Sequence, residues 1–169
     1  MSGTAKTLNV FVTGGASGIG YGIGEYLAKQ GHHIVIADIN EEAAKQAAKK
    51  LNDLGLSAQS VQINVCDAQQ VAALPATLRN TPIDILINNA GIGEFNLLED
   101  SGSQTISHLI DLNLNVPIQL TRLILPTLKA RRVAALINIG SALGSIGYPG
   151  YSVYGASKSG LRGFSEALR

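Results

Sequence analysis

The chain has 169 residues, of which 46% are hydrophobic and 15% are charged. This length supports one packed core and is too short for two full domains, so we expect a single domain over residues 1–169. The 13 Lys and Arg residues against 12 Asp and Glu residues give a net charge of +1, without a block of like charge. This pattern argues against nucleic acid as a partner.

Cysteine, histidine and apolar content narrow the class of protein further. The single cysteine, Cys66, excludes an internal disulfide framework, and no cysteine pair or histidine cluster has metal-ligand spacing. Met1 to Thr7 is short and polar, and no later stretch reaches the roughly 18 apolar residues of a membrane span. We therefore expect a soluble cytoplasmic protein with no metal site and no membrane contact.

Short apolar runs rich in Val and Ile alternate along the chain with longer segments of helical period. The predicted strands are Leu8 to Thr13, His33 to Asp38, Ala58 to Val65, Ile83 to Asn88 and Val133 to Ile139. The predicted helices are Ile19 to Gln30, Glu41 to Leu54, Asp67 to Leu78, Ser103 to Lys129, and a segment after Gly150. We expect the fourth helix to bend or break at Pro117 and Pro126. The alternation predicts an α/β fold, a doubly wound Rossmann-type parallel sheet with helices on both faces.

A glycine-rich stretch directly follows the first predicted strand and directly precedes a helix. Gly14, Gly18 and Gly20, with Ser17 and Ile19 between them, allow a tight turn that brings main-chain N–H groups close to a pyrophosphate. The alternatives are a plain turn and a nucleoside triphosphate loop. The latter lacks support because no lysine follows Gly20. This stretch therefore predicts a dinucleotide site.

Asp38 ends the second predicted strand, eighteen residues after Gly20. Folds of this class place an acidic residue there to hold the adenosine ribose hydroxyls. The alternative is a turn or helix-capping aspartate, although Asn40 is the better placed cap for the helix that begins at Glu41. Because the carboxylate would repel a 2'-phosphate, the sequence predicts NAD over NADP.

Two motifs resemble the short-chain dehydrogenase/reductase family. The spacing of Gly14, Gly18 and Gly20 is similar to its T-G-x-x-x-G-x-G pattern, and Asn88-Asn89-Ala90-Gly91 matches its N-N-A-G sequence. The resemblance implies that Asn89, Ala90 and Gly91 lie beside the cofactor. It also implies adenine contact at Asn64-Val65, where relatives have Asp-Val. NADP users of the family often carry a basic residue where this chain has Ser17 or Ile39, which also favours NAD.

Tyr154 and Lys158 are the predicted proton-transfer pair. Four residues apart on a helix, they lie on one face, so the ammonium can stabilise the phenolate and lower the pKa of the tyrosine. By itself, such a pair of side chains more often lies on the protein surface without a catalytic function. Ser141 follows the fifth strand, where open α/β sheets bind ligands, although a serine there usually only forms a turn. The resemblance implies a catalytic role for Tyr154, Lys158 and Ser141. It also implies a catalytic asparagine, which Asn113 matches better than Asn115 does.

The resemblance implies distinct roles for these residues. Tyr154 acts as acid or base, Lys158 tunes it and binds the nicotinamide ribose, Ser141 positions the carbonyl, and Asn113 holds a water. The implied reaction is hydride transfer between a nicotinamide cofactor and a small-molecule secondary alcohol or ketone. The alternatives are a dinucleotide-binding module or inactive fragment without a substrate lid, and an epimerase or dehydratase. A Ser-His hydrolase is poorly supported because no serine lies in G-x-S-x-G.

Family members are usually longer than this chain. The resemblance therefore implies that the C-terminal strands of the sheet are missing, together with the segment that covers the substrate. It also implies a homodimer or homotetramer, because relatives pair through the long helix and the terminal one. The substrate itself is not predicted.

Overall fold

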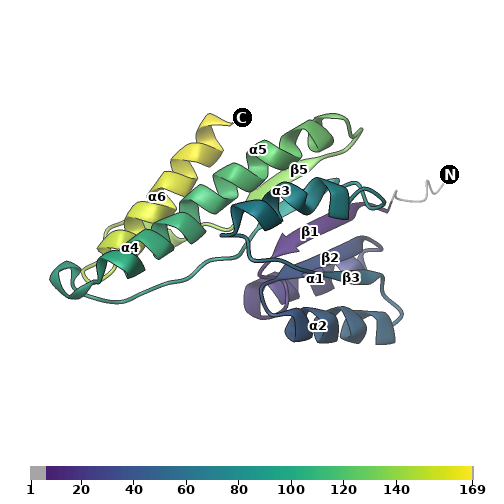
Figure 1. Ribbon diagram of the computed structural model, residues 1–169, viewed down its shortest axis with the longest axis horizontal. Helices are drawn as coiled ribbons and strands as arrows, with labels where there is room; N and C mark the ends of the chain where they lie inside the picture. The colour runs from purple at the N-terminus through teal and green to yellow at the C-terminus, as the bar shows by residue number, and fades with distance from the viewer. Residues whose placement is uncertain (1–6, 169) are drawn as a thin grey trace.

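The computed structural model describes residues 7–168, so residue 169 and all of the polar lead segment except Thr7 lie outside the described part. Five parallel strands form one sheet in the order β3-β2-β1-β4-β5. They are β1 (Asn9–Thr13), β2 (His33–Asp38), β3 (Ala58–Gln62), β4 (Ile85–Asn88) and β5 (Ala135–Asn138). The predicted doubly wound parallel sheet is confirmed, with slightly shorter strands than the sequence indicates (Figure 1).

Six helices connect and follow the strands in the described part of the chain. They are α1 (Gly18–Lys29), α2 (Glu41–Asp53), α3 (Ala68–Thr77), α4 (Ser103–Ile110), α5 (Val116–Lys129) and α6 (Ser152–Ala167). Two of them begin at a side-chain cap: the Asn40 side chain accepts from the Ala43 N–H at 3.0 Å, and Asp67 accepts from the Gln69 N–H at 2.8 Å. Asn40 is therefore the cap of α2, as predicted.

Two apolar cores lie on opposite faces of the sheet. On one face, α1 and α2 pack small side chains such as Ala28 and Ala44 against Val10 and Ile34. On the other, α3 and α5 pack larger ones against β1 and β4, with Leu120 fully buried. Figure 1 shows α4 and α6 beside each other, extending beyond the sheet. The central strands β1, β2 and β4 are mostly apolar because both of their faces are covered, whereas the edge strand β3, AQSVQ, is only partly buried.

The predicted long helix is interrupted, but not at Pro126, which α5 contains. The interruption is a π-helical segment, η2 (Asp111–Asn115), immediately before Pro117. Proline has no N–H to donate to the carbonyl four residues earlier, which is that of Asn113. The chain takes up this defect as one wide turn, and such π segments are frequent at functional sites.

A buried carboxylate joins the start of the sheet to the end of α5. Asp84, 1% exposed, accepts from the Asn9 N–H at 2.9 Å and from Arg131 Nε at 2.6 Å. This bond raises the pKa of the Arg131 guanidinium. We expect Asp84→Ala to lower the free energy of unfolding by about 2–3 kcal/mol, because buried donors lose their acceptor. Urea unfolding measures this free energy. The control is Asp53→Ala, which removes an exposed surface ion pair. If Asp84→Ala changed the free energy of unfolding no more than Asp53→Ala does, Asp84 would not have this stabilising role.

The topology brings the polar ends of the strands together. Because all five strands are parallel, the residues that follow them lie at one edge of the sheet. The chain order reverses between β1 and β4, which are neighbours in the sheet. Open α/β sheets bind their ligands outside such a reversal point. This edge therefore contains the candidate site.

Candidate active site

A cavity of about 320 Å³ lies at this edge of the sheet, beside the reversal point. It brings together six of the residues that the sequence predicts for cofactor contact: Gly14, Asp38, Asn64, Val65, Ala90 and Gly91. Its lining also includes residues that the sequence analysis did not single out for the site, among them His108 and Leu112. These two come from the long helical region, whose packing over the sheet could not be derived from helical period alone.

The glycine loop leaves the main chain open toward a ligand. Gly14 has φ +60° and Gly18 has φ +53°, a backbone region that favours glycine. A Cβ at Gly20 would lie 2.3 Å from the Gly14 carbonyl oxygen. Ser17 is the N-cap residue of α1, but its side chain makes no capping bond, in contrast to the caps of α2 and α3. The first N–H groups of α1 therefore remain available to an anion, as a pyrophosphate requires.

Hydrogen bonds tie the glycine loop to the segment after β4. The Asn89 side chain donates to the carbonyls of Thr13 at 2.9 Å and Gly14 at 3.0 Å. The Thr13 hydroxyl oxygen accepts from the N–H groups of Asn89 and Ala90, both at 3.0 Å. The sequence analysis quoted Thr13 only as part of the loop motif. Its place at a strand end before the first glycine was the signal that could have suggested this role.

Asp38 faces the glycine loop from the end of β2. Its carboxylate accepts from the Ala16 N–H at 3.2 Å and from the Asn40 N–H at 3.0 Å. Neighbouring Ser17 and Ile39 are exposed and uncharged. Asp38 is thus fixed at the rim of the cavity, with a negative charge and no basic residue at these two flanking positions.

Asn64 and Val65 lie beyond β3, which ends at Gln62, so their predicted place within the third strand is wrong. The Asn64 side chain accepts from the Cys66 N–H at 3.0 Å, while the Asn64 main-chain N–H donates to the Gln70 side-chain oxygen at 2.8 Å. Such a local turn competes with the strand ladder and ends it. Both residues still line the cavity.

Lys158 is buried beside Tyr154, with 7% of the lysine exposed. Its Nζ donates to the Ile139 carbonyl at 2.9 Å and lies 5.8 Å from the centroid of the Tyr154 ring. Burial lowers the pKa of this ammonium from its ordinary value. Gly91 lets the Asn113 side chain approach the main chain, since a Cβ at Gly91 would lie only 2.9 Å from the Asn113 side-chain oxygen.

Asn113 holds the loop after β4 from within the π segment. Its amide exchanges two bonds with the Ile92 main chain, at 2.9 Å and 2.8 Å, and donates to the Ser157 hydroxyl at 3.2 Å. Ser157 in turn donates to the Tyr154 carbonyl at 2.7 Å. The sequence analysis did not identify Ser157. The one feature that could have indicated its role is that a polar residue stands beside Lys158 on a helix face predicted to be apolar.

Ser141 begins a short 3-10 turn, η3 (Ala142–Gly144), that packs on the start of α6. Its hydroxyl oxygen accepts from the Leu143 N–H at 3.2 Å. Ser141 and Lys158 line the same small cavity of about 230 Å³. The bonds of Ser141 within residues 7–168 leave its hydroxyl proton free to donate.

Comparison with known proteins identifies the family. A family model described as short chain dehydrogenase matches residues 8–169. The chain belongs to the short-chain dehydrogenase family. The glycine loop and the pair formed by Tyr154 and Lys158 are among the motifs by which the sequence resembles this family.

Curated relatives match almost all of this chain. A 3-oxoacyl-[acyl-carrier-protein] reductase, FabG, of Chlamydia muridarum is 38% identical over 161 residues, 93% of this chain and 64% of that protein. An uncharacterized oxidoreductase, YxjF, of Bacillus subtilis is 32% identical over 157 residues, 92% and 61% of the two chains. A metagenomic short-chain oxidoreductase crystallised with NADP has a TM-score of 0.90 at 29% identity, covering 95% and 74%. The chain thus spans about three fifths of the length of these curated relatives.

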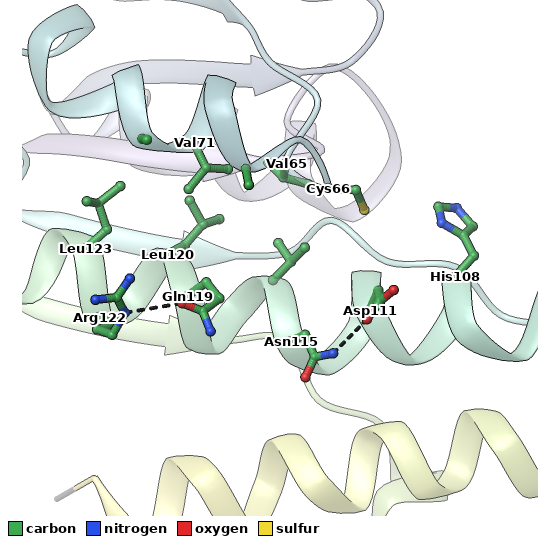
Figure 2. Close-up of a pocket in the computed structure, with 13 residues that line it drawn as sticks. Val65, Cys66, Val71, His108, Asp111, Asn115, Gln119, Leu120, Arg122 and Leu123 are labelled. Carbon is green, nitrogen blue, oxygen red and sulfur yellow. Dashed lines mark hydrogen bonds between the residues drawn. The ribbon is translucent and has the colours of Figure 1, made fainter.

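A second cavity, about 430 Å³, lies between α3 and α5 (Figure 2). Apolar side chains such as Val71 and Leu120 line it, and it meets the first cavity at Val65, Cys66 and His108, which line both. Partial burial, with the nearby Asp111 carboxylate, raises the pKa of the Cys66 thiol, which disfavours a nucleophilic thiolate.

Across residues 7–168, no helix is long and apolar enough to span a membrane, and no group of three metal-binding side chains gathers.

Proposed function

We propose that this chain transfers a hydride between a nicotinamide cofactor and a secondary alcohol or ketone, with Tyr154 as acid and base. One observation carries the proposal: the buried Lys158 ammonium, held by the Ile139 carbonyl, lies 5.8 Å from the Tyr154 ring. A buried cation beside a phenol is costly as a structural feature and useful for proton transfer. The reductase of Chlamydia muridarum takes a 3-oxoacyl group, which contains a ketone, and this supports the substrate class.

The cleft residues fit a dinucleotide. The open glycine loop, the uncapped start of α1 and the Asp38 carboxylate provide the contacts for pyrophosphate and ribose. Ser17, Gly18, Ile19 and Gly20 would face the pyrophosphate, and Asn64 and Val65 the adenine. Asn89, Ala90 and Gly91 would lie along the cofactor. When bound there in reduced form, the nicotinamide supplies the hydride.

The side chains carry out the proton transfer. Tyr154 gives its hydroxyl proton to the carbonyl oxygen as the hydride reaches the carbonyl carbon and the C=O π electrons move to oxygen. Lys158 stabilises the resulting phenolate and holds the nicotinamide ribose, and solvent returns the proton to Tyr154. Ser141 donates a hydrogen bond to the substrate oxygen and keeps its proton. Asn113 positions the loop at Ile92 and holds the water predicted from the resemblance.

The activity test uses NADH and a panel of ketones. We expect NADH fluorescence to change on binding and NADH absorbance to fall with at least one ketone. Binding without oxidation of NADH by any ketone in the panel would contradict the enzyme proposal and favour a dinucleotide-binding module.

We also propose a preference for NAD, although the metagenomic relative carries NADP. Asp38 would repel a 2'-phosphate, so Asp38→Ser is expected to shift the ratio of NADH to NADPH affinity toward NADPH by about tenfold or more. Fluorescence titration with each cofactor gives the ratio. Asp53→Ser is the matched control at an exposed, remote carboxylate. An unchanged ratio in Asp38→Ser would leave Asp38 with a structural role only.

Self-association is the third element of the proposal. We propose a homodimer or homotetramer in which α5 and α6 meet their counterparts in a second copy. The family resemblance supports this, because relatives pair through the long helix and the terminal one. Sedimentation velocity over a range of concentrations tests it, and a monomer at every concentration would contradict it.

A further inference from the structure

Four aromatic side chains form a continuous row that ends at Tyr154. Its ring meets the ring of Tyr151 edge-on, with centroids 6.0 Å apart. Tyr151 in turn lies 5.3 Å from Phe95 and 6.2 Å from Tyr148, measured between centroids. We call these four residues the aromatic row. Tyr154, Tyr151 and Tyr148 belong to the region after β5, and Phe95 belongs to the loop after β4.

Main-chain contacts fix the two loops against each other. The Asn96 N–H donates to the Gly150 carbonyl at 2.8 Å, and Tyr151 N–H donates to the Tyr148 carbonyl at 3.1 Å. Gly150 has φ +82°, and a Cβ there would lie 2.4 Å from the Phe95 ring. Only glycine permits this close contact. These contacts hold Phe95 and Tyr151 in place against each other.

The outer part of the aromatic row is exposed. Phe95 is 68% exposed and Tyr148 is 60% exposed, and the same two loops also expose Leu97 and Ile146. Grouped exposed apolar side chains usually mark a binding surface. Because the row is continuous with Tyr154, a group attached to the reacting carbon would extend along it.

Charge at the same loops is of one sign. The connections 89–102 and 139–151 contain three acidic residues, Glu94, Glu99 and Asp100, and no Lys or Arg. Two cations lie nearby: Lys158 is buried and bonded to the Ile139 carbonyl, and Arg162 donates to the Ser145 hydroxyl at 2.9 Å and is paired with Glu166. The three carboxylates of these loops would therefore repel an anionic substrate.

We propose that the aromatic row selects uncharged substrates with a flat aryl group on the carbonyl or carbinol carbon. This inference rests on the proposed function, because it places the reacting carbon at Tyr154. The aryl face would pack on Tyr151 in the offset or edge-on geometry that aromatic pairs favour, with Phe95 and Tyr148 beyond it. A saturated ring of the same size gains burial but not this aromatic contact.

Binding of unreactive amides tests the selectivity without turnover. Calorimetric titration in the presence of NADH should give benzamide about fivefold tighter binding than cyclohexanecarboxamide, the contribution of roughly one aromatic pair. Benzoate should bind more weakly than benzamide. Equal affinity for benzamide and cyclohexanecarboxamide would overturn the aryl preference, and benzoate binding as tight as benzamide would overturn the selection against anions.

Variants separate the aromatic row from general effects. Tyr151→Leu should bring the ratio of the two amide affinities close to one, and exposed Phe95→Leu should lower it without a risk to folding. Tyr26→Leu, at a tyrosine 64% exposed on α1, is the matched control and should keep the wild-type ratio. If both variants kept the wild-type ratio of amide affinities, the proposal would be overturned. It would also be overturned if the protein is a dimer and Phe95→Leu dissociates it, because Phe95 would then belong to the dimer interface.

The two proposals fail in different ways. An aryl preference in binding, with no oxidation of NADH by aryl methyl ketones, would refute the enzymatic function and leave the aromatic row as a ligand site. Ketone reduction with no aryl preference would refute only the role of the row.

Discussion

Tyr154→Phe is expected to lower the turnover number by roughly 10²-fold or more, the usual contribution of general acid/base catalysis. The substitution removes only the hydroxyl group. The edge-on contact with Tyr151 and the position of the ring beside Lys158 depend on the ring, so they should persist. NADH affinity, measured by fluorescence titration, should therefore stay close to that of the wild type while NADH oxidation slows.

The control for this loss is Tyr26→Phe, which removes a hydroxyl from an exposed tyrosine on α1. Its turnover should equal that of the wild type. If Tyr154→Phe retained near-normal turnover, Tyr154 would not be the acid, and the assignment of Ser141 and Lys158 around it would lose its basis.

Gly20→Ala is expected to weaken NADH binding by about tenfold or more and to destabilise the fold by roughly 1–3 kcal/mol, as overpacking does. The added Cβ would lie 2.3 Å from the Gly14 carbonyl oxygen and 2.5 Å from the Asn89 side-chain nitrogen. Main chain would have to move, and it belongs to the loop proposed to hold the pyrophosphate. Fluorescence titration and urea unfolding measure the two effects.

Gly22→Ala provides a matched comparison two residues along the same helix. A Cβ at Gly22 meets nothing within 4 Å, and alanine favours a helix over glycine by up to about 1 kcal/mol. This variant should therefore be as stable as the wild type or more stable, with unchanged NADH affinity. Equal NADH affinity in Gly20→Ala and Gly22→Ala would refute the role of the glycine loop in cofactor binding.

The sheet could be predicted because the central strands are apolar runs between helical segments, and helices on both faces require that pattern. Strand ends could not, because local bonds decide them. The turn at Asn64 ends β3 early. The interruption of the long helix was expected at Pro117 and Pro126, but only Pro117 lies next to it, as the π segment ends at Asn115. Proline marks a missing N–H, whereas tertiary packing decides whether a helix bends, widens or continues.

The candidate site could be predicted where its residues lie in short motifs, as Gly14 to Gly20 do. Contacts between distant segments could not. The Thr13 hydroxyl receives two N–H groups from a loop more than seventy residues away, and Phe95 joins Tyr151 from another strand end. Neither contact leaves a periodic signal in the sequence, because each depends on how two loops meet at the edge of the sheet.

The most direct test of the central claim is a single-turnover experiment that follows the hydride. The wild type and Tyr154→Phe are mixed with NADH dideuterated at C4 of the nicotinamide, together with a cyclic and an aryl ketone. Mass spectrometry then reads the alcohols. We predict deuterium on the carbinol carbon with the wild type and far less in the same time with Tyr154→Phe. The claim that this chain transfers a hydride with Tyr154 as the acid would be contradicted by either of two results. One is that NADH binds but both ketones are recovered unreduced, and the other is that the two proteins transfer equal amounts of deuterium.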